Sequence, residues 1–123
     1  MFTLGKRSQD NLKGVDNKLV AVVTKAIQIS KQDFTVIEGL RTRQRQAQLL
    51  AQGASKTMDS KHLVGRAVDI VPYPIPTDWS KYTAKQWNDI AVAMKTAAKE
   101  LNVNIVWGGD WKSFVDKPHF ELA

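Results

Sequence analysis

Two long segments of this chain place their apolar residues at the spacing of an amphipathic helix, and this periodicity constrains the fold most strongly. In residues 15–30 the apolar side chains recur every three or four positions, with lysines between them. Asp16 is a candidate N-cap for this helix. Another amphipathic helix is expected to begin where Thr83 and Gln86 form a capping box. Its expected apolar face comprises Trp87, Ile90, Ala91, Met94, Ala98 and Leu101.

Between these helices lie shorter apolar segments with the composition of strands. Residues 34–39, FTVIEG, predict a short buried strand, and residues 66–71, RAVDIV, predict a second one that ends at a proline. A polar-faced helix over 42–53 is expected between them, because Gly53 is a favoured residue just past a helix end. A loop over 54–65 connects this helix to the second strand.

The C-terminal part predicts two more strands. They lie near 103–107 and 119–122, on either side of a loop over 108–118. The sequence therefore predicts one α+β domain, residues 1–123, in which three helices pack on a small antiparallel or mixed sheet.

The composition excludes several classes of site. The chain of 123 residues is long enough to bury one core, and it has no cysteine, which excludes disulfides, thiolate metal sites and cysteine nucleophiles. A formal net charge of +6 favours anionic partners such as a cell envelope, nucleic acid or acidic lipid. The basic residues are scattered and no nucleic-acid motif is present, which argues against a nucleic-acid-binding domain.

The N-terminal segment MFTLGKRSQDNLKG lacks the apolar core of a signal peptide. No apolar run is long enough to cross a bilayer. We therefore expect a protein that is made in the cytoplasm and does not insert into a membrane, and nothing in the sequence requires more than a monomer.

The chain has only two histidines, and each lies near an aspartate. In SKHLVGRAVDI, Asp69 follows His62 by seven positions, and in DKPHFEL, Asp116 precedes His119 by three. Because side chains alternate along a strand, Asp69 faces away from the core if its two apolar neighbours face into it. In the last strand, His119 likewise faces away from the core if Phe120 faces into it. Asp69 and both histidines are therefore expected to converge on the open face of the sheet.

Two imidazoles and one carboxylate are a complete set of protein ligands for catalytic zinc, with a fourth position left for water. Zinc lowers the pKa of such water from about 16 to about 7, and a base must then accept its proton. Asp116 is the best-placed candidate for that base. The alternative is that each histidine is an ordinary surface or core residue, which is commoner for a single histidine. Aspartate is depleted in strands, so its presence beside both histidines strengthens the zinc interpretation. On the residues alone, a zinc site and ordinary histidines are then equally strong interpretations.

The segment SKHLVGRAVDIV resembles the Ser-x-His-x6-Asp motif of a family of zinc peptidases. That family includes D-alanyl-D-alanine carboxypeptidases, phage L-alanyl-D-glutamate endopeptidases and the hedgehog signalling domain. WGGDWKSFVDKPHFEL resembles the C-terminal half of the same site. The opening LGKRSQDNLKGVDNKLVAVV and the stretch from VIEGLRTRQRQ to RAVDIV resemble the phage endolysin endopeptidases most. The resemblance covers nearly the whole chain, and its motifs are specific in combination.

This resemblance implies that His62, Asp69 and His119 are zinc ligands and that Asp116 is the general base. Many relatives have glutamate at the position of Asp116, so a shorter carboxylate would perform the role here. Arg41, in GLRTRQRQ, matches an arginine that faces the site. A guanidinium suits the oxyanion of a tetrahedral intermediate or a substrate carboxylate. The alternative for Arg41 is a surface position at the start of a helix.

Further residues are candidates for substrate binding or for support of the ligands. By the same resemblance, Gln46 and Ser60 line the substrate groove or support the ligands. Ser60 is alternatively a cap of the turn that precedes His62.

Two tryptophans and one glutamate complete the candidate site. Trp107 and Trp111 flank a Gly-Gly pair and are candidates for a groove wall, with core or rim positions as the alternative. Glu121 shares a strand face with His119, and it is either a hydrogen-bond partner of that histidine or a solvated carboxylate.

The resemblance implies a zinc-dependent peptidoglycan peptidase of the endolysin type, which cuts the stem peptide between L-alanine and D-glutamate. Such an enzyme would wait in the host cytoplasm and reach the wall after the membrane is breached, and its positive charge suits an anionic envelope. One alternative on the same scaffold is a D,D-carboxypeptidase that removes terminal D-alanine. Another is a zinc-stabilised binding module without catalysis, against which the retained Asp116 argues.

Overall fold

The computed structural model describes residues 1–53 and 60–123. The α-helices are α1 (Lys6–Asn11), α2 (Asn17–Ile29), α3 (Arg43–Ala51) and α4 (Ala84–Glu100). The strands are β1 (Phe34–Glu38), β2 (Ala67–Pro72), β3 (Ile105–Trp107) and β4 (His119–Leu122). Short 3-10 helices are η1 (Lys61–Val64), η2 (Trp79–Lys81) and η3 (Gly108–Asp110). Residues 54–59 of the loop predicted over 54–65 lie outside the described residues.

The four strands form one antiparallel sheet in the order β1-β2-β4-β3. This confirms the predicted α+β class, and of the two predicted sheet types, antiparallel or mixed, the sheet is antiparallel. Asp69 of β2 lies directly opposite His119 of β4. A register shift between Val36 and Glu38 in β1 places Glu38 opposite Asp69 on the other side. Three polar residues from three neighbouring strands therefore lie side by side on the sheet.

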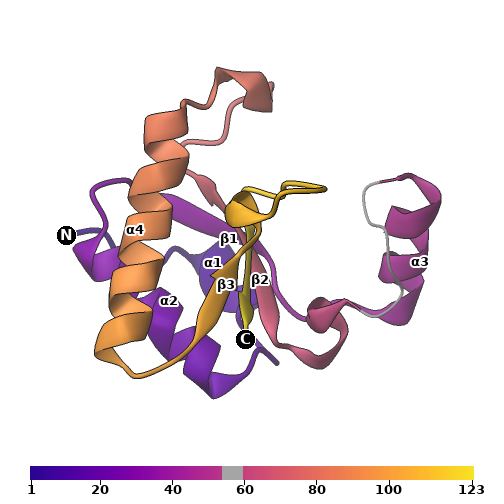
Figure 1. Cartoon of the computed structure of the whole chain (residues 1–123), viewed down its shortest axis with the longest axis horizontal. Helices are drawn as coiled ribbons and strands as arrows, with labels where there is room; N and C mark the ends of the chain where they lie inside the picture. Colours follow the sequence, from indigo (N-terminus) through magenta and orange to yellow (C-terminus); the bar gives the residue numbers. More distant parts are fainter. Residues whose placement is uncertain (54–59) are drawn as a thin grey trace.

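The core lies between the sheet and the two long helices, α2 and α4 (Figure 1). Both helices begin at the predicted caps: Asp16 accepts a hydrogen bond from the backbone N–H of Lys18, and Thr83 and Gln86 form the capping box. The fully buried apolar side chains include Leu19, Val22, Val23, Val36, Val68, Ile70, Met94 and Phe120. Val68 and Ile70 thus enter the core, as the alternation along their strand predicts.

Helix α1 was not predicted, because six residues are too few for a periodic apolar pattern. It covers the edge of the sheet beside β1. The hydroxyl of Ser8 accepts the backbone N–H of Val36 at 2.9 Å, and the side-chain amide of Asn11 donates to the carbonyl of Val36 at 2.8 Å. These bonds satisfy backbone groups that a sheet edge leaves unpaired.

Helix α3 stands apart from the sheet, on the opposite side of the molecule from α4 (Figure 1). Gln46 is its buried residue, and the rest of the helix is exposed or half-buried, in keeping with its polar sequence. None of the helices in residues 1–53 and 60–123 combines the length and the apolar character that crossing a membrane requires.

Candidate metal centre and active-site cavity

His62, Asp69 and His119 come together although they belong to three different elements. Asp69 and His119 are cross-strand partners on β2 and β4, and His62 lies in η1 just before β2. The hydroxyl of Ser60 caps η1 by accepting the backbone N–H of His62 at 3.2 Å. Gly65 ends η1 with a φ of 72°, a left-handed conformation that favours glycine and turns the chain into β2. The predicted cap at Ser60 is therefore present.

The hydrogen bonds around the two imidazoles determine which nitrogen of each ring carries the proton. Nδ1 of His62 lies 2.9 Å from the carbonyl oxygen of Gly39, which can only accept, so Nδ1 is the donor. Nε2 of His119 lies 2.8 Å from a carboxylate oxygen of Glu121, so this nitrogen is the donor in that ring. In their neutral forms, His62 therefore presents the lone pair of Nε2, and His119 presents that of Nδ1.

These two lone pairs face each other and one oxygen of Asp69. Nε2 of His62 lies 3.3 Å from Nδ1 of His119, and Oδ1 of Asp69 lies 3.3 and 3.4 Å from these nitrogens. Oδ1 is buried and has no hydrogen-bond partner among the described residues. Three electron-rich atoms at this separation repel one another unless a cation lies between them.

The arrangement fits a tetrahedral metal ion. Donor atoms that lie about 2.0–2.1 Å from a tetrahedral zinc ion lie about 3.3–3.4 Å from one another, which is the spacing of the three atoms here. One ligand atom from each of His62, Asp69 and His119 is available, and the nitrogen and oxygen donors suit zinc. The cluster can therefore hold a metal ion, as the sequence predicted.

When no cation is bound, protons can partly take its place. Burial alone would raise the pKa of Asp69, but protonation of His119 and His62 would turn the facing nitrogens into donors, and their hydrogen bonds and charge hold that pKa well below its ordinary value. Burial alone would lower the pKa of His119, but the hydrogen bond and charge of Asp69, helped by Glu121 and Asp116, raise it. The cluster thus favours a positive charge between its members.

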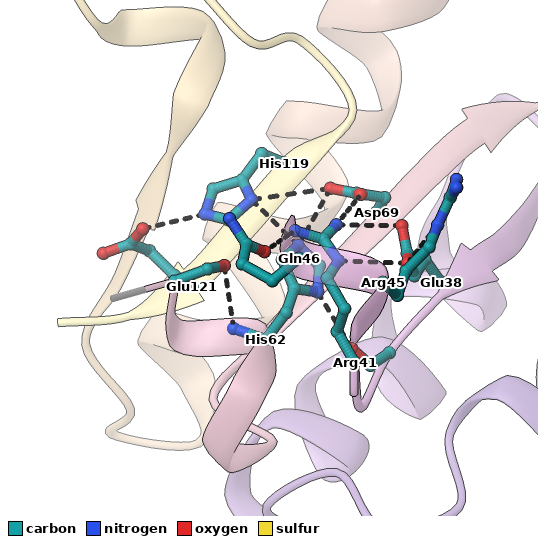
Figure 2. A network of polar contacts seen from close by, with 10 residues as sticks. Glu38, Arg41, Arg45, Gln46, His62, Asp69, His119 and Glu121 are labelled. Atoms are coloured by element: carbon teal, nitrogen blue, oxygen red, sulfur yellow. Dashed lines mark hydrogen bonds and ion pairs between the residues drawn. The ribbon is translucent and has the colours of Figure 1, made fainter. Parts of the chain in front are cut away.

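Arg41 holds the other oxygen of Asp69. Its Nη2 lies 3.3 Å from Oδ2 of Asp69 and 2.8 Å from Glu38, which also accepts from Nε at 3.0 Å (Figure 2). Nη1 donates to the side-chain oxygen of buried Gln46 at 2.7 Å. Arg41 is only 8% exposed, so it is not the surface arginine of the alternative interpretation. It lies beside the site and orients the carboxylate of Asp69.

A second carboxylate orients His119. Glu121 accepts from Nε2 of His119 and, through its other oxygen, from Nζ of Lys61 at 2.9 Å. Lys61 also donates to the carbonyl of Leu122 at 2.6 Å. A carboxylate behind a metal-binding histidine fixes the orientation of the ring and makes it more basic. The geometry favours the hydrogen-bonding interpretation of Glu121 over the solvated one.

The cluster opens into a cavity of about 510 Å³. Asp116 lines this cavity together with the three cluster residues and Arg41. Burial raises the pKa of Asp116, and the nearby negative charge of Asp69 raises it further, while His119, His62 and Arg41 partly oppose this. A carboxylate with a raised pKa is a better proton acceptor near neutral pH. Other lining residues are Arg45, Ser60, Lys61, Trp79, Trp111 and Phe114.

The close approach of two chain segments places Asp116 beside the cluster. The backbone N–H of Asp116 donates to the carbonyl of Gly108 at 3.0 Å, and that of His119 donates to the carbonyl of Asp116 at 3.1 Å. A Cβ at Gly108 would overlap the carbonyl oxygen of Asp116 and would lie 3.1 Å from the Cβ of His119. Only glycine fits at this position without a shift of the loop.

The sequence family follows from a comparison over the whole chain. The family model of the phage L-alanyl-D-glutamate peptidases matches residues 1–123. The chain belongs to this family. This confirms the resemblance that the motifs around His62 and His119 indicated.

Individual relatives agree with this assignment. The chain is 36% identical over 119 residues to the L-alanyl-D-glutamate peptidase of Escherichia phage T5, and the match covers 94% of this chain and 85% of that protein. It is 34% identical over 120 residues to the L-alanyl-D-glutamate peptidase of Listeria phage A118, but spans only 41% of that longer protein. The crystal structure of Serratia marcescens L-Ala D-Glu endopeptidase ChiX superposes with a TM-score of 0.87 at 39% identity, covering 99% of this chain and 90% of that one.

In this member of the phage L-alanyl-D-glutamate peptidase family, the predicted site residues divide into two groups. The first group lines the cavity and comprises His62, Asp69, His119, Asp116, Arg41, Ser60 and Trp111. The ring centroids of Trp111 and His119 lie 5.1 Å apart. The second group, Gln46 and Trp107, does not line the cavity. Gln46 is buried behind Arg41, which favours its supporting role. Trp107 is 8% exposed and stacks on Phe120, which favours its core alternative.

Glu38, Lys61 and Gly108, which support the site, were not singled out from the sequence, and neither were the cavity-lining residues Arg45, Trp79 and Phe114. A signal existed for Glu38, because a glutamate three positions before Arg41 is a candidate ion-pair partner. For Lys61 and Gly108 there was none, because both act on segments that are distant in the sequence.

Proposed function

We propose that this chain is a zinc-dependent peptidase that hydrolyses the L-alanyl-D-glutamate bond of the peptidoglycan stem peptide. One observation carries the proposal: two imidazole lone pairs and an unpartnered carboxylate oxygen face one another at the spacing of zinc ligands, in a cavity that also contains Asp116. The activity named for the phage T5 and A118 relatives and for ChiX supports the choice of bond.

His62, Asp69 and His119 would hold the zinc ion, with Arg41 and Glu121 keeping two of these ligands in orientation. When bound, zinc supplies a Lewis acid that polarises the scissile carbonyl and makes water acidic. The carboxylate of Asp116 accepts the proton of the attacking water and delivers it to the nitrogen of the leaving D-glutamyl amine. The positive charge of Arg41 favours the negative charge that develops on the carbonyl oxygen.

The test is digestion of purified peptidoglycan with and without chelator and added zinc, followed by mass spectrometry of the released fragments. We expect zinc-dependent release of fragments with a new N-terminal D-glutamate. Release of single D-alanines would identify a D,D-carboxypeptidase instead. If the protein binds zinc but cleaves nothing, the peptidase proposal is refuted and the chain is a binding module.

The role of Asp116 has its own test and control. Asp116→Asn should lower kcat by at least 100-fold while zinc binding stays intact, since an amide cannot accept the proton. Asp110→Asn is the matched control, because Asp110 lies in the same loop region, pairs with Lys95 at 2.6 Å and does not line the cavity. Equal activity of both variants would remove Asp116 from the mechanism.

We further propose that the protein is made in the host cytoplasm, acts on the wall after the membrane is permeabilised, and is held there by its net charge of +6. Binding to isolated cell walls should then weaken steeply as salt is raised from 0.05 to 0.5 M (about 13 to 4 Å of screening length). Binding that does not change with salt would refute the electrostatic anchor.

A further inference from the structure

We propose that Arg45 binds the free carboxylate of the glutamyl residue on the leaving side of the scissile bond, and that the leaving peptide continues from there into a second hollow. The inference rests on the proposed function. Its starting point is chemical: a glutamyl residue has two carboxyl groups, so one can remain as a free anion when the other continues the peptide. A site that selects glutamate over an uncharged residue needs a cation for that anion.

The cavity has three cationic side chains among its described lining residues, and two of them are already engaged. Arg41 donates from Nε, Nη1 and Nη2 to Glu38, Gln46 and Asp69. Lys61 donates to a backbone carbonyl and pairs with Glu121. Recruiting either of them for the substrate would release a group that orients a metal ligand. Arg45 is the third cation.

Arg45 has the looser environment that a substrate-binding cation requires. Its one ion-pair contact among the described residues joins Nε to Glu38 at 3.8 Å, which is beyond hydrogen-bonding distance, and its side chain is 49% exposed. Glu38 is already bonded by two hydrogens from Arg41. Figure 2 shows Arg45 beside Glu38, at the end of the polar network opposite to Glu121. A substrate carboxylate can therefore pair with Arg45 without breaking a hydrogen bond of the site.

Arg45 also stands where two hollows meet. A second hollow of about 500 Å³ shares Ile37, Glu38 and Arg45 with the active-site cavity. Its other charged lining residues are Arg7, Asp10 and Lys13. Asp10 is neutralised by Lys6 at 2.8 Å and Lys13 at 3.4 Å, while Arg7 has no ion pair in the described part of the chain. The balance of charge suits a peptide with further carboxylates.

The experiment compares two short peptides that contain the L-alanyl-D-glutamyl bond. In one, the glutamyl residue has its free carboxylate, and in the other that carboxylate is an amide. We expect wild-type enzyme to prefer the carboxylate peptide by about tenfold in kcat/KM, the scale of one charge-assisted hydrogen bond. Arg45→Gln should raise KM for the carboxylate peptide and abolish this preference, while kcat/KM for the amide peptide changes less than twofold.

Two further variants separate recognition from a structural role. Arg45→Lys keeps the charge and should retain part of the preference. Arg43→Gln removes the same charge from an exposed position on the same helix that lines neither hollow, and it should behave as wild type. Zinc content, measured by elemental analysis, should be equal in all variants.

The outcomes are distinguishable. If wild type cleaves neither peptide nor peptidoglycan, the proposed function fails. If wild type cleaves both peptides equally well, or if Arg45→Gln lowers kcat/KM for both peptides by the same factor, the role of Arg45 is refuted while the peptidase remains.

The path into the second hollow is tested with a carboxylate peptide extended by two acidic residues on the leaving side. Arg7→Gln should raise KM for the extended peptide about threefold and leave the short one unchanged, with exposed Lys18→Gln as the charge-matched control. Equal effects of Arg7→Gln on both peptides, or none on either, would refute the path.

Discussion

Nη2 of Arg41 lies 3.3 Å from Oδ2 of Asp69, while Oδ1 of the same carboxylate faces the two histidines. The two oxygens of Asp69 therefore have different partners. Because Arg41 is itself held by Glu38 and Gln46, the orientation of Asp69 depends on a chain of contacts that reaches β1 and α3.

Removing Arg41 should weaken both metal binding and folding. In Arg41→Ala, Glu38 and Asp69 lose a nearly buried partner, so we expect zinc affinity to fall about 10- to 100-fold and the unfolding free energy to fall by about 3 kcal/mol. Arg41→Lys keeps the charge but not the planar fork of N–H donors, so its zinc affinity and unfolding free energy should lie between those of wild type and Arg41→Ala. Calorimetric zinc titration and denaturant unfolding measure these changes, with Arg43→Ala as control. Unchanged zinc affinity in Arg41→Ala would show that Asp69 is oriented without it.

Replacing Glu121 should act through His119. In Glu121→Gln the amide oxygen still accepts from Nε2 of His119, but the negative charge that makes the ring more basic is lost. We expect zinc affinity to fall about tenfold with little change in secondary structure. Glu100→Gln, which removes a carboxylate that pairs with Lys25 and does not line the cavity, is the matched control. A zinc affinity equal to that of the control would show that Glu121 does not affect metal binding through His119.

After metal has been removed by chelation, the stability of the protein should depend on pH through two groups that act in opposite directions. The pKa of Asp69 is lowered from 3.8, so its contribution to stability is present above that value and is lost as pH falls. The pKa of His119 is raised from 6.5, so its contribution is present below that value and is lost as pH rises through its folded pKa. Zinc binding requires neutral imidazoles, so the stabilisation that zinc gives should increase as pH rises through the folded pKa of His119.

The measurement is a thermal melt at pH 5.5, 7 and 8, with chelator and with zinc. We expect the Tm of metal-free protein to fall from pH 5.5 to 8 and the rise in Tm on adding zinc to grow. His119→Ala should abolish both trends. A zinc effect that is constant across these pH values would contradict the assignment of the imidazoles as ligands.

Gly108 should not tolerate a methyl group. A Cβ there overlaps the carbonyl of Asp116, so Gly108→Ala must push the loop away from the cluster. We expect a loss of about 1–3 kcal/mol in unfolding free energy and a fall in kcat, because Asp116 moves. Gly5→Ala is the control, since a Cβ at Gly5 meets nothing within 4 Å. Full activity in Gly108→Ala would mean that the loop position does not matter for Asp116.

Much of the fold was predictable because it depends on local chemistry. The cap at Asp16 and the capping box of Thr83 and Gln86 are interactions between residues two or three positions apart, so the sequence contains both partners. The alternation around Asp69 predicted which face of β2 the carboxylate occupies. The two histidines, being so few, stood out as candidate metal ligands, and the resemblance to the zinc peptidases favoured that role over an ordinary one.

What the sequence could not supply were contacts between distant segments. Asp69 pairs with His119 and lies opposite Glu38 only because of the order β1-β2-β4-β3 and the register shift in β1, neither of which is encoded by a local pattern. The same holds for the core position of Trp107 and for the link from Lys61 to Glu121. Local periodicity determined the elements and the faces of this protein, whereas the pairing of strands, which depends on packing summed over the whole chain, decided how the site is supported.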